Sequence, residues 1–272
     1  MARSIALTIA GSDSSGGAGI QADLKTFSAF GVYGASVITA LTAQNTRGVT
    51  GALPTPPDFI AAQIDAVAAD LAIGAVKTGM LATRAAVDVV ADRITRHKLG
   101  PLIVDPVMIS TSGDSLIDEA AIGALAARLI PLAELITPNL PEAARLLGLP
   151  AARNVVEMDS QARQLQSRFK VPNVLLKGGH GSGAEAIDLL LAGATAIPLA
   201  RPRLTSHNTH GTGCTLSAAI TALMATGVPL VDAVTRAKAY VWHAIAAADS
   251  LGVGHGTGPV DHLYHLRRDP PA

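Results

Sequence analysis

The sequence contains one cysteine, Cys214, and no apolar run long enough to cross a membrane. A single cysteine excludes a disulfide within the chain and is typical of a reducing compartment. The first apolar run, residues 5–10, is soon followed by Gly, Ser and Asp, and it is too short for a signal peptide or a transmembrane helix. We therefore expect a cytoplasmic protein without a membrane partner.

Charged and aromatic side chains are also scarce. Charged residues make up 15% and aromatic residues 3% of the 272 residues, and 21 basic side chains balance 21 acidic ones. A neutral chain has no long-range attraction for nucleic acid, so DNA and RNA are not expected partners. The hydrophobic fraction of 49% must then pack mostly through aliphatic side chains. This composition favours a sheet covered by helices on both faces, because strands buried on both sides are continuously apolar.

Short apolar segments alternate with segments of helical periodicity along the chain. The apolar segments are expected to be buried strands, and they comprise residues 5–10, 36–41, 75–77, 102–104, 135–137 and 174–177. Between them, Ile60, Ile64, Val67 and Leu71 recur at helical spacing, and residues 216–224 do the same. This alternation predicts an α/β fold with a central, mostly parallel sheet flanked by helices on both faces, in three layers.

No linker rich in Pro, Gly or Ser divides the chain into halves of different composition. The densest proline cluster, residues 53–58, immediately precedes a helical pattern, and proline is common at the first helical position. The sequence also contains no internal repeat and no low-complexity tract. We therefore expect residues 1–272 to form a single domain.

Polar and glycine residues follow each expected strand. They occupy residues 11–19, 44–46, 78–80, 105–108, 138–142 and 178–180. In an open parallel sheet, ligands bind beyond the carboxyl ends of the strands, where all these segments would gather. This convergence is the main indication of a functional site.

The first of these segments is a glycine-rich turn. Residues 17–22 match the dinucleotide-binding pattern Gly-x-Gly-x-x-Ala between a strand and a helix. A dinucleotide site also needs an acidic residue about 20 positions further on, but after Asp23 the next one is Asp58. The glycines therefore favour close approach of the backbone to a small ligand over a dinucleotide. Asp23 either points inward from the margin of the apolar helix face or is a solvated first-turn carboxylate.

A second glycine-containing segment, residues 208–215, leads directly into a helical pattern. Gly211 and Gly213 flank Thr212 where unpaired backbone N–H groups and the positive end of the helix dipole favour an anion. Such a site stabilises a phosphoryl group during transfer. A helix N-terminus lowers the pKa of a thiol, which would make Cys214 a proton acceptor. A buried, inert cysteine is the alternative.

Oxygen ligands and a cation follow three other strands. Asn139, Glu142 and Asp105 offer the hard oxygens that Mg2+ accepts together with water, although Glu142 is also compatible with a plain first-turn charge. Lys177 would hold a nucleotide phosphate, unless it is a surface lysine. The histidines at positions 207 and 210 lack the partners of a metal site. The P-loop and protein-kinase patterns are absent from the sequence, so a nucleotide would bind here in another way.

Taken together, these segments resemble the hydroxymethylpyrimidine/phosphomethylpyrimidine kinases of thiamine biosynthesis, in the ribokinase-like superfamily. The resemblance rests on residues 10–23, 40–46, 105–108, 137–143, 176–180 and 209–214, and it spans residues 9 to about 262. It implies a ribokinase-like fold. It also implies ATP-dependent phosphorylation of 4-amino-5-hydroxymethyl-2-methylpyrimidine to its monophosphate and then to its diphosphate.

The resemblance further implies roles for single residues and a homodimer. Gln44 and Asp23 would pair with ring and amino nitrogens of the substrate, which gives discrimination that apolar contacts cannot. Cys214 stands where the wider superfamily usually has an aspartate base. The full set comprises Gly11, Ala18, Asp23, Gln44, Met80 and Val107 around the pyrimidine, Gly211, Thr212, Gly213 and Cys214 in catalysis, Lys177, Asn139 and Thr212 at ATP, and Glu142 and Asp105 at Mg2+.

Some features depart from the family or leave alternatives open. Asp261 stands where the family pattern has Asn, and residues 109–114 are a candidate flap over the phosphates. A pyridoxal kinase of the same fold is the nearest alternative, although Cys214 and Gln44 favour the pyrimidine. A dinucleotide-dependent oxidoreductase and a non-catalytic ligand-binding relative are less favoured, because the ribose-binding acid is missing while the substrate and nucleotide segments are complete.

Overall fold

The computed structural model describes residues 3–108, 117–179, 181 and 183–266. Within these residues the strands are β1 (Ile5–Asp13), β2 (Tyr33–Asn45), β3 (Gly48–Pro54), β4 (Ile73–Thr78), β5 (Leu102–Val104), β6 (Leu135–Ile136), β7 (Asn173–Leu176), β8 (Glu185–Ala192) and β9 (Thr195–Pro202). The helices are α1 (Gly19–Ala29), α2 (Pro57–Asp70), α3 (Arg84–His97), α4 (Glu119–Ala124), α5 (Leu140–Leu147), α6 (Val155–Phe169), α7 (Thr212–Ala225) and α8 (Leu230–Ala246), with short turns η1 (Leu125–Leu129), η2 (Ile130–Leu132), η3 (Ala248–Leu251) and η4 (Tyr264–Leu266).

The described strands form one sheet in the order β3-β2-β1-β4-β5-β6-β7-β8-β9. Neighbours from β2 to β7 are parallel, whereas β3, β8 and β9 join antiparallel at the two edges. The predicted strands are all present in the parallel centre of this sheet. The prediction of a mostly parallel sheet is therefore confirmed, and the three antiparallel edge strands are an addition to it.

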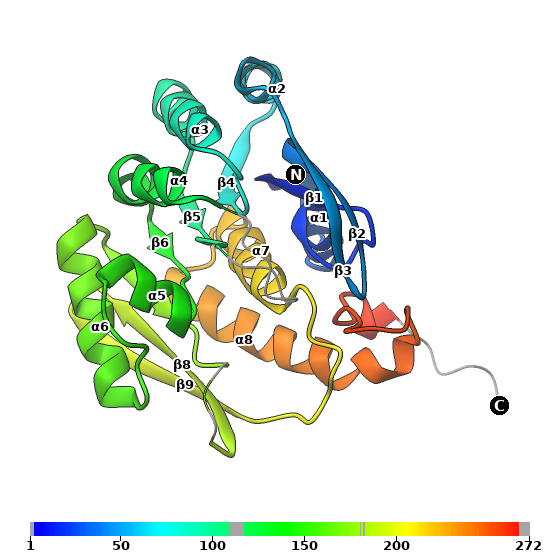
Figure 1. The fold of residues 1–272 in the computed structure, drawn as a ribbon, viewed down its shortest axis with the longest axis vertical. Helices are drawn as coiled ribbons and strands as arrows, with labels where there is room; N and C mark the ends of the chain where they lie inside the picture. Colours follow the sequence, from blue (N-terminus) through cyan, green and yellow to red (C-terminus); the bar gives the residue numbers. More distant parts are fainter. Residues whose placement is uncertain (1–2, 109–116, 180, 182, 267–272) are drawn as a thin grey trace.

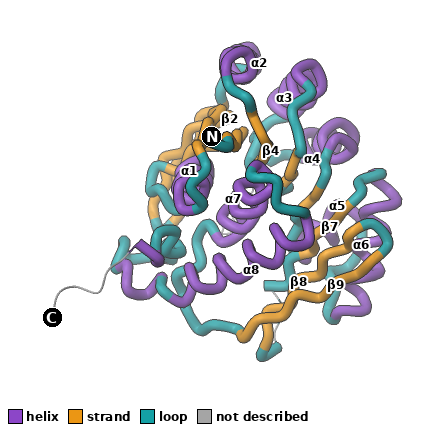
Figure 2. The backbone as a smooth tube through the Cα atoms, turned by 180° about the vertical axis from the view of Figure 1, so that it is seen from behind, coloured by secondary structure: helices purple, strands orange, loops and turns teal. Residues whose placement is uncertain are grey.

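Helices cover both faces of the sheet (Figure 1). Side chains alternate along each strand, so Leu102 and Val104 join the core under α2–α6 while Ile103 joins the core under α7 and α8. α1 packs beside α7 on the second face, as the view from behind also shows (Figure 2). The three-layer architecture is confirmed, and no helix in the described part of the chain is long and apolar enough to span a bilayer.

Two helices begin where their sequences predict. α2 begins at Pro57 with Asp58 in its first turn, so the proline cluster does open a helix. α7 begins directly after Gly211 and is buried without interruption from Thr215 to Leu223. It contacts α1 and α8 beside it and β1, β4 and β5 beneath it. The tip of α7 is thereby fixed at the carboxyl edge of the parallel strands.

Candidate active site

A cavity of about 600 Å³ lies at the carboxyl ends of the parallel strands. Every predicted site residue except Asp23 lines it, namely Gly11, Ala18, Gln44, Met80, Asp105, Val107, Asn139, Glu142, Lys177, Gly211, Thr212, Gly213 and Cys214. The convergence predicted from the parallel topology is therefore present. The candidate flap, residues 109–114, lies outside the described residues.

Asp13 organises the glycine-rich turn between β1 and α1. Its Oδ1 accepts hydrogen bonds from the backbone N–H of Ser15 at 2.8 Å and from the Ser15 hydroxyl at 2.7 Å. Its Oδ2 accepts the backbone N–H groups of Gly17 and Ala18 at 3.1 and 2.8 Å. Burial would raise the pKa of Asp13, but the bonds from His210 and Ser15 outweigh it and hold that pKa well below its usual range. The turn is thus shaped around an ionised carboxylate.

His210 connects this turn to the tip of α7. Its Nε2 lies 2.8 Å from Asp13 Oδ2 and 3.3 Å from Gln44 Nε2, and both members of the Asp13–His210 pair are buried. From the sequence His210 was weighed only as a metal ligand, and this contact was not predicted. The sequence does place a histidine immediately before the glycines at the start of α7. Its aspartate partner, however, lies far away in sequence, in the first glycine-rich turn.

The tip of α7 requires glycine at position 211. Gly211 is left-handed with φ +79°, and a Cβ there would overlap the carbonyl oxygen of Gly17. The Gly211 carbonyl accepts both the N–H and the hydroxyl of Thr215 at 2.8 Å. The first residues of the helix line the cavity, and a helix N-terminus is an arrangement that can bind an anion.

Cys214 lies in the first turn of α7 and is only partly exposed. Burial raises the pKa of its thiol to about 11, although Lys77 and the backbone N–H of Gly19 oppose that rise. The predicted lowering of the Cys214 pKa is therefore wrong, because desolvation outweighs the helix N-terminus. At neutral pH the thiol carries its proton.

Lys177 and Asp105 form an ion pair beside the α7 tip. Lys177 Nζ lies 2.9 Å from Asp105 Oδ1, which also accepts a 3.1 Å bond from the Thr137 hydroxyl. Asp105 Oδ2 accepts a 3.2 Å bond from Ser217. Burial would raise the pKa of Asp105, but the ammonium groups of Lys177 and Lys77 hold it below its usual range. Both oxygens of Asp105 thus accept bonds from protein donors and anchor Lys177, and its predicted role at magnesium stays a prediction.

Lys177 points to the tip of α7 instead of to solvent. A Cβ added to Gly213 would lie 3.2 Å from Lys177 Nζ, and the lysine side chain is 14% exposed. Burial would lower the pKa of Lys177, but Asp105 and Glu142 raise it above its usual range. A permanent positive charge therefore stands beside the N-terminus of α7.

Asn139 and Glu142 cap α5 reciprocally. Asn139 Oδ1 accepts the Glu142 N–H at 2.8 Å, and Glu142 Oε2 accepts the Asn139 N–H at 2.8 Å. Glu142 is buried, and burial raises its pKa to about 7 despite the nearby Lys177. The alternative left open for Glu142, a plain first-turn carboxylate, would be solvated. The Glu142 carboxyl is instead buried, and the positive charge around it does not offset that burial.

A magnesium ion fits these residues only with help from other ligands. In the residues that the structure describes, no group of three or more His, Cys, Asp and Glu side chains could hold a metal. Mg2+ commonly uses one or two carboxylates together with waters and substrate phosphates. Because the raised pKa of Glu142 reflects uncompensated burial, a nearby divalent cation would stabilise its ionised form. The donor set fits a magnesium ion that arrives with a nucleotide.

Asp23 does not reach the cavity. Its Oδ1 lies 2.5 Å from Lys77 Nζ, its Oδ2 accepts a 2.6 Å bond from Thr8, and the side chain is fully buried. Of the two orientations left open by the sequence, the inward one is correct. The predicted direct contact between Asp23 and a substrate is corrected, because protein partners hold both carboxylate oxygens.

The far half of the cavity was not predicted. Trp242, Val241 and Ile245 of α8 line it, together with Lys238. The Trp242 indole donates a 2.8 Å bond to the Pro202 carbonyl, which fixes the ring at the end of β9. This apolar wall suits a flat heterocycle, but its residues come from a helix without a recognisable motif.

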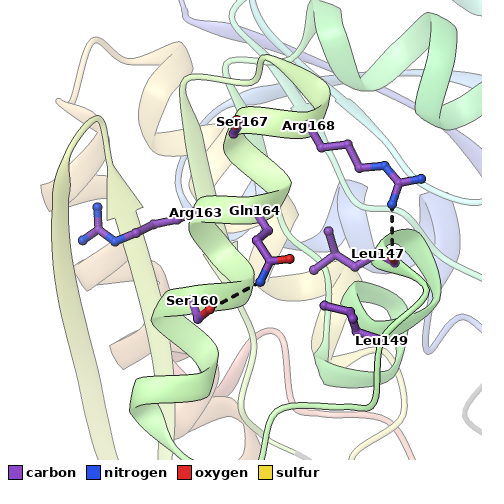
Figure 3. A pocket seen from close by; sticks show the side chains of 7 residues that line it. All are labelled: Leu147, Leu149, Ser160, Arg163, Gln164, Ser167 and Arg168. Carbon is purple, nitrogen blue, oxygen red and sulfur yellow. Dashed lines mark hydrogen bonds between the residues drawn. The ribbon is translucent and has the colours of Figure 1, made fainter.

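A second pocket lies between α5 and α6 and is separate from this edge (Figure 3). Arg168 of α6 donates to the Leu147 carbonyl of α5 at 3.1 Å, and Gln164 donates to Ser160 within α6 at 3.3 Å. The lining residues are Leu147, Leu149, Ser160, Arg163, Gln164, Ser167 and Arg168. The first contact joins the two helices, and none of the predicted site residues lies in this pocket.

Comparisons with known proteins agree with this geometry. A family model described as phosphomethylpyrimidine kinase matches residues 13–261. A hydroxymethylpyrimidine/phosphomethylpyrimidine kinase of Rhizobium meliloti is 53% identical over 265 residues, which cover 97% of this chain and 99% of the relative. The solved Bacillus subtilis pyridoxal kinase in an ADP complex has a TM-score of 0.90 at 35% identity, covering 98% of this chain and 100% of that one. The solved Clostridium difficile phosphomethylpyrimidine kinase has a TM-score of 0.79 at 44% identity, covering 89% and 99%.

Proposed function

The chain belongs to the phosphomethylpyrimidine kinase family, and we propose that it phosphorylates 4-amino-5-hydroxymethyl-2-methylpyrimidine with ATP and then phosphorylates the product again. The enzyme is a hydroxymethylpyrimidine/phosphomethylpyrimidine kinase that acts in thiamine biosynthesis. The observation that carries this proposal is one cavity with the α7 tip, Lys177 and Cys214 at one point and Gln44 at another.

The pyrimidine would lie between the glycine-rich turn and the strand ends. A Cβ at position 11 would overlap the methyl group of Met80. Glycine at this position therefore lets the Met80 side chain lie against β1. Met80, Ala18 and Val107 line this part of the cavity with apolar atoms that suit a flat ring. Gln44, placed beside His210, supplies the amide that would pair with ring and amino nitrogens of the substrate.

The phosphates would bind at the tip of α7. The N–H groups of Gly213 and Cys214 and the ammonium of Lys177 would stabilise the charge that develops on the transferred phosphoryl group. Asn139 and Glu142 would position magnesium through waters and phosphate oxygens, where the ion neutralises phosphate charge. Thr212 lines the same end of the cavity and would contact ATP.

The reaction needs one proton acceptor. The substrate hydroxyl oxygen forms a bond to the γ-phosphorus, the bond from that phosphorus to the bridging oxygen of ADP breaks, and ADP leaves with the electron pair. The proton of the hydroxyl passes to the ionised sulfur of Cys214. Because the Cys214 thiol has a pKa of about 11, this role predicts activity that rises with pH.

Pyridoxal is the second candidate substrate, because the Bacillus subtilis structure of similar fold is named a pyridoxal kinase. An ATP-coupled assay on both alcohols, followed by mass detection of mono- and diphosphate, tests the proposal. Turnover of the pyrimidine to both products supports it, and turnover of pyridoxal alone contradicts it.

A homodimer, a cytoplasmic location and a single domain also stay proposals. One continuous sheet supports the single domain. Exposed apolar side chains such as Leu53 and Phe59, which are 66% and 60% exposed, would permit self-association. Sedimentation equilibrium of the purified chain measures the oligomeric state.

A further inference from the structure

Beneath the cavity floor lies an ion pair that the proposed reaction does not use. Lys77 Nζ lies 2.5 Å from Asp23 Oδ1, and both side chains are 0% exposed. The Thr8 hydroxyl completes the arrangement with a 2.6 Å bond to Asp23 Oδ2. Hydrophobic side chains of similar volume often stabilise a fold as well as a buried ion pair does, or better. Stability alone therefore gives no reason for these charges.

The pair lies next to the tip of α7. A Cβ added to Gly79, which lines the cavity, would lie 3.7 Å from Lys77 Nζ, so the ammonium sits directly under the floor. Asp23 belongs to α1, whose first residue, Gly19, lines the same cavity as Cys214. Both α1 and β4 contact α7. Two neighbouring elements thus bring the pair to the thiol.

Four charged side chains act on this thiol. Lys77 comes from β4, Asp23 from α1, Asp105 follows β5, and Lys177 follows β7. Burial raises the pKa of Cys214, Lys77 is the largest opposing influence, and Asp23 and Asp105 each raise the pKa by less than Lys77 lowers it. The Lys77 ammonium therefore favours the Cys214 thiolate, and the Asp23 carboxylate opposes it.

We propose that Lys77 is a positioning residue for the phosphoryl transfer: its buried ammonium, held by Asp23 and Thr8, stabilises the Cys214 thiolate that accepts the substrate proton. This inference rests on the proposed role of Cys214 as proton acceptor. The thiol releases its own proton to solvent before the reaction, and the thiolate then takes the proton of the substrate hydroxyl. Asp23 acts in this scheme through Lys77 and does not touch the substrate.

The single cysteine allows a direct test without turnover. Alkylation by iodoacetamide reports only on Cys214, since the sequence holds no other thiol. Asp23→Asn removes the opposing carboxylate and keeps an oxygen for Lys77, so alkylation at fixed pH between about 7 and 9 is expected to become faster. The double variant Asp23→Asn/Lys77→Met removes both charges, so alkylation is expected to become slower.

In each variant the alkylation rate is expected to change about threefold. A shift of one pKa unit changes the thiolate fraction about tenfold, and the accompanying change in nucleophilicity offsets about half of this on a logarithmic scale. Simple loosening of the site would accelerate alkylation in both variants, so opposite signs distinguish the electrostatic role from a structural one. The rise of kcat/KM with pH should likewise shift to lower pH in Asp23→Asn and to higher pH in the double variant.

The control is an ion pair whose residues do not line the cavity, Arg93–Asp65 between α3 and α2, with atoms 3.0 Å apart. In Asp65→Asn/Arg93→Met the alkylation rate of Cys214 should stay at the wild-type value. The double variant Asp23→Asn/Lys77→Met leaves no unpaired charge, so it can still be measured if Asp23→Asn does not fold. An unchanged or faster rate in that folded double variant overturns the proposal. Full kinase activity in Cys214→Ala would instead refute the proton acceptor, which alkylation does not measure.

Discussion

His210 Nε2 lies 2.8 Å from Asp13 Oδ2, and this contact joins the two glycine-rich segments of the cavity across 197 positions of sequence. One partner shapes the turn after β1, and the other immediately precedes the tip of α7. One buried pair therefore fixes to each other the two parts of the cavity where we propose that the pyrimidine and the phosphates bind.

His210→Leu should raise the KM for the pyrimidine about tenfold or more. The substitution leaves the buried Asp13 carboxylate without one of its donors, a loss of about 1–3 kcal/mol, and it removes the neighbour of Gln44. Steady-state kinetics with both substrates measures the effect. His210→Gln, which keeps a donor, should recover part of it, and His207→Leu, on an exposed side chain of the same loop, should behave as wild type. Equal kinetics for His210→Leu and His207→Leu would contradict this role.

Gln44→Ala should weaken use of the pyrimidine about 10- to 100-fold and leave ATP binding nearly intact, because only the heterocycle end loses a hydrogen-bonding group. Trp242, the single tryptophan, lines the far half of the cavity and provides a fluorescence titration for ATP. Gln164→Ala, on the exposed face of α6, is the control. Equal losses of pyrimidine and ATP binding would argue against the assigned pocket.

Gly211→Ala should lower kcat about 100-fold or more, because a Cβ would push the tip of α7 away from the Gly17 carbonyl and displace the phosphate donors. Gly227 has a similar φ of +83° but no atom within 4 Å of the added Cβ. Gly227→Ala should therefore lose only about 1–2 kcal/mol of stability and keep its activity. Similar kcat values for the two variants would show that backbone strain, and not the contact at Gly17, explains the loss.

Activity should rise with pH because the Cys214 thiol has a pKa of about 11. Below that value the thiolate fraction increases about tenfold per pH unit, so kcat/KM for the pyrimidine should rise almost as steeply between about pH 7 and 9. Cys214→Ala should flatten the profile. A variant profile that keeps the wild-type slope would exclude the thiol as proton acceptor.

Glu142→Gln should stabilise the protein above pH 7 and weaken its activation by Mg2+. Burial raises the folded-state pKa of Glu142 from 4.5 to about 7, so the stability gained by holding this proton is full below 4.5 and is lost as pH rises through about 7. A neutral glutamine avoids that loss, and we expect a gain of about 1–3 kcal/mol at pH 8 and none at pH 4 by denaturant unfolding.

Glu157 provides the matched control for this prediction. It occupies the same position after the cap of α6, but its bond with Arg153 lowers its pKa. Its charge therefore favours the folded state above its ordinary pKa, and Glu157→Gln should not stabilise the protein at pH 8. A gain in both variants would point to a general effect of removing acidic charge.

The centre of the fold could be predicted from sequence, but its edges could not. Segments such as residues 102–104 are purely aliphatic because both of their faces are buried, and this pattern is visible without a structure. β9 exposes alternate residues and contains Pro198, so its sequence resembles a loop as much as a strand. Edge strands carry weaker patterns because neighbouring elements cover them on fewer sides.

The site was predictable to the extent that its residues follow strands. Gly11, Asn139 and Lys177 stand next to strand ends, and parallel topology alone brings them together. The direction of the Asp23 side chain depends on Lys77, which lies 54 positions away and within a strand. The pKa of Cys214 depends on how deeply the tip of α7 is enclosed. Neither packing relationship is encoded in the local pattern around the residue.

The enclosure of α7 also determines how its amides exchange with solvent. The segment from Thr215 to Leu223 is buried on every side, so its N–H groups should exchange deuterium only when much of the molecule opens. One turn earlier, Gly213 and Cys214 line the cavity, and their N–H groups should exchange rapidly until a phosphate occupies the tip. The slowest and the most ligand-sensitive amides of the protein would then be neighbours on a single helix.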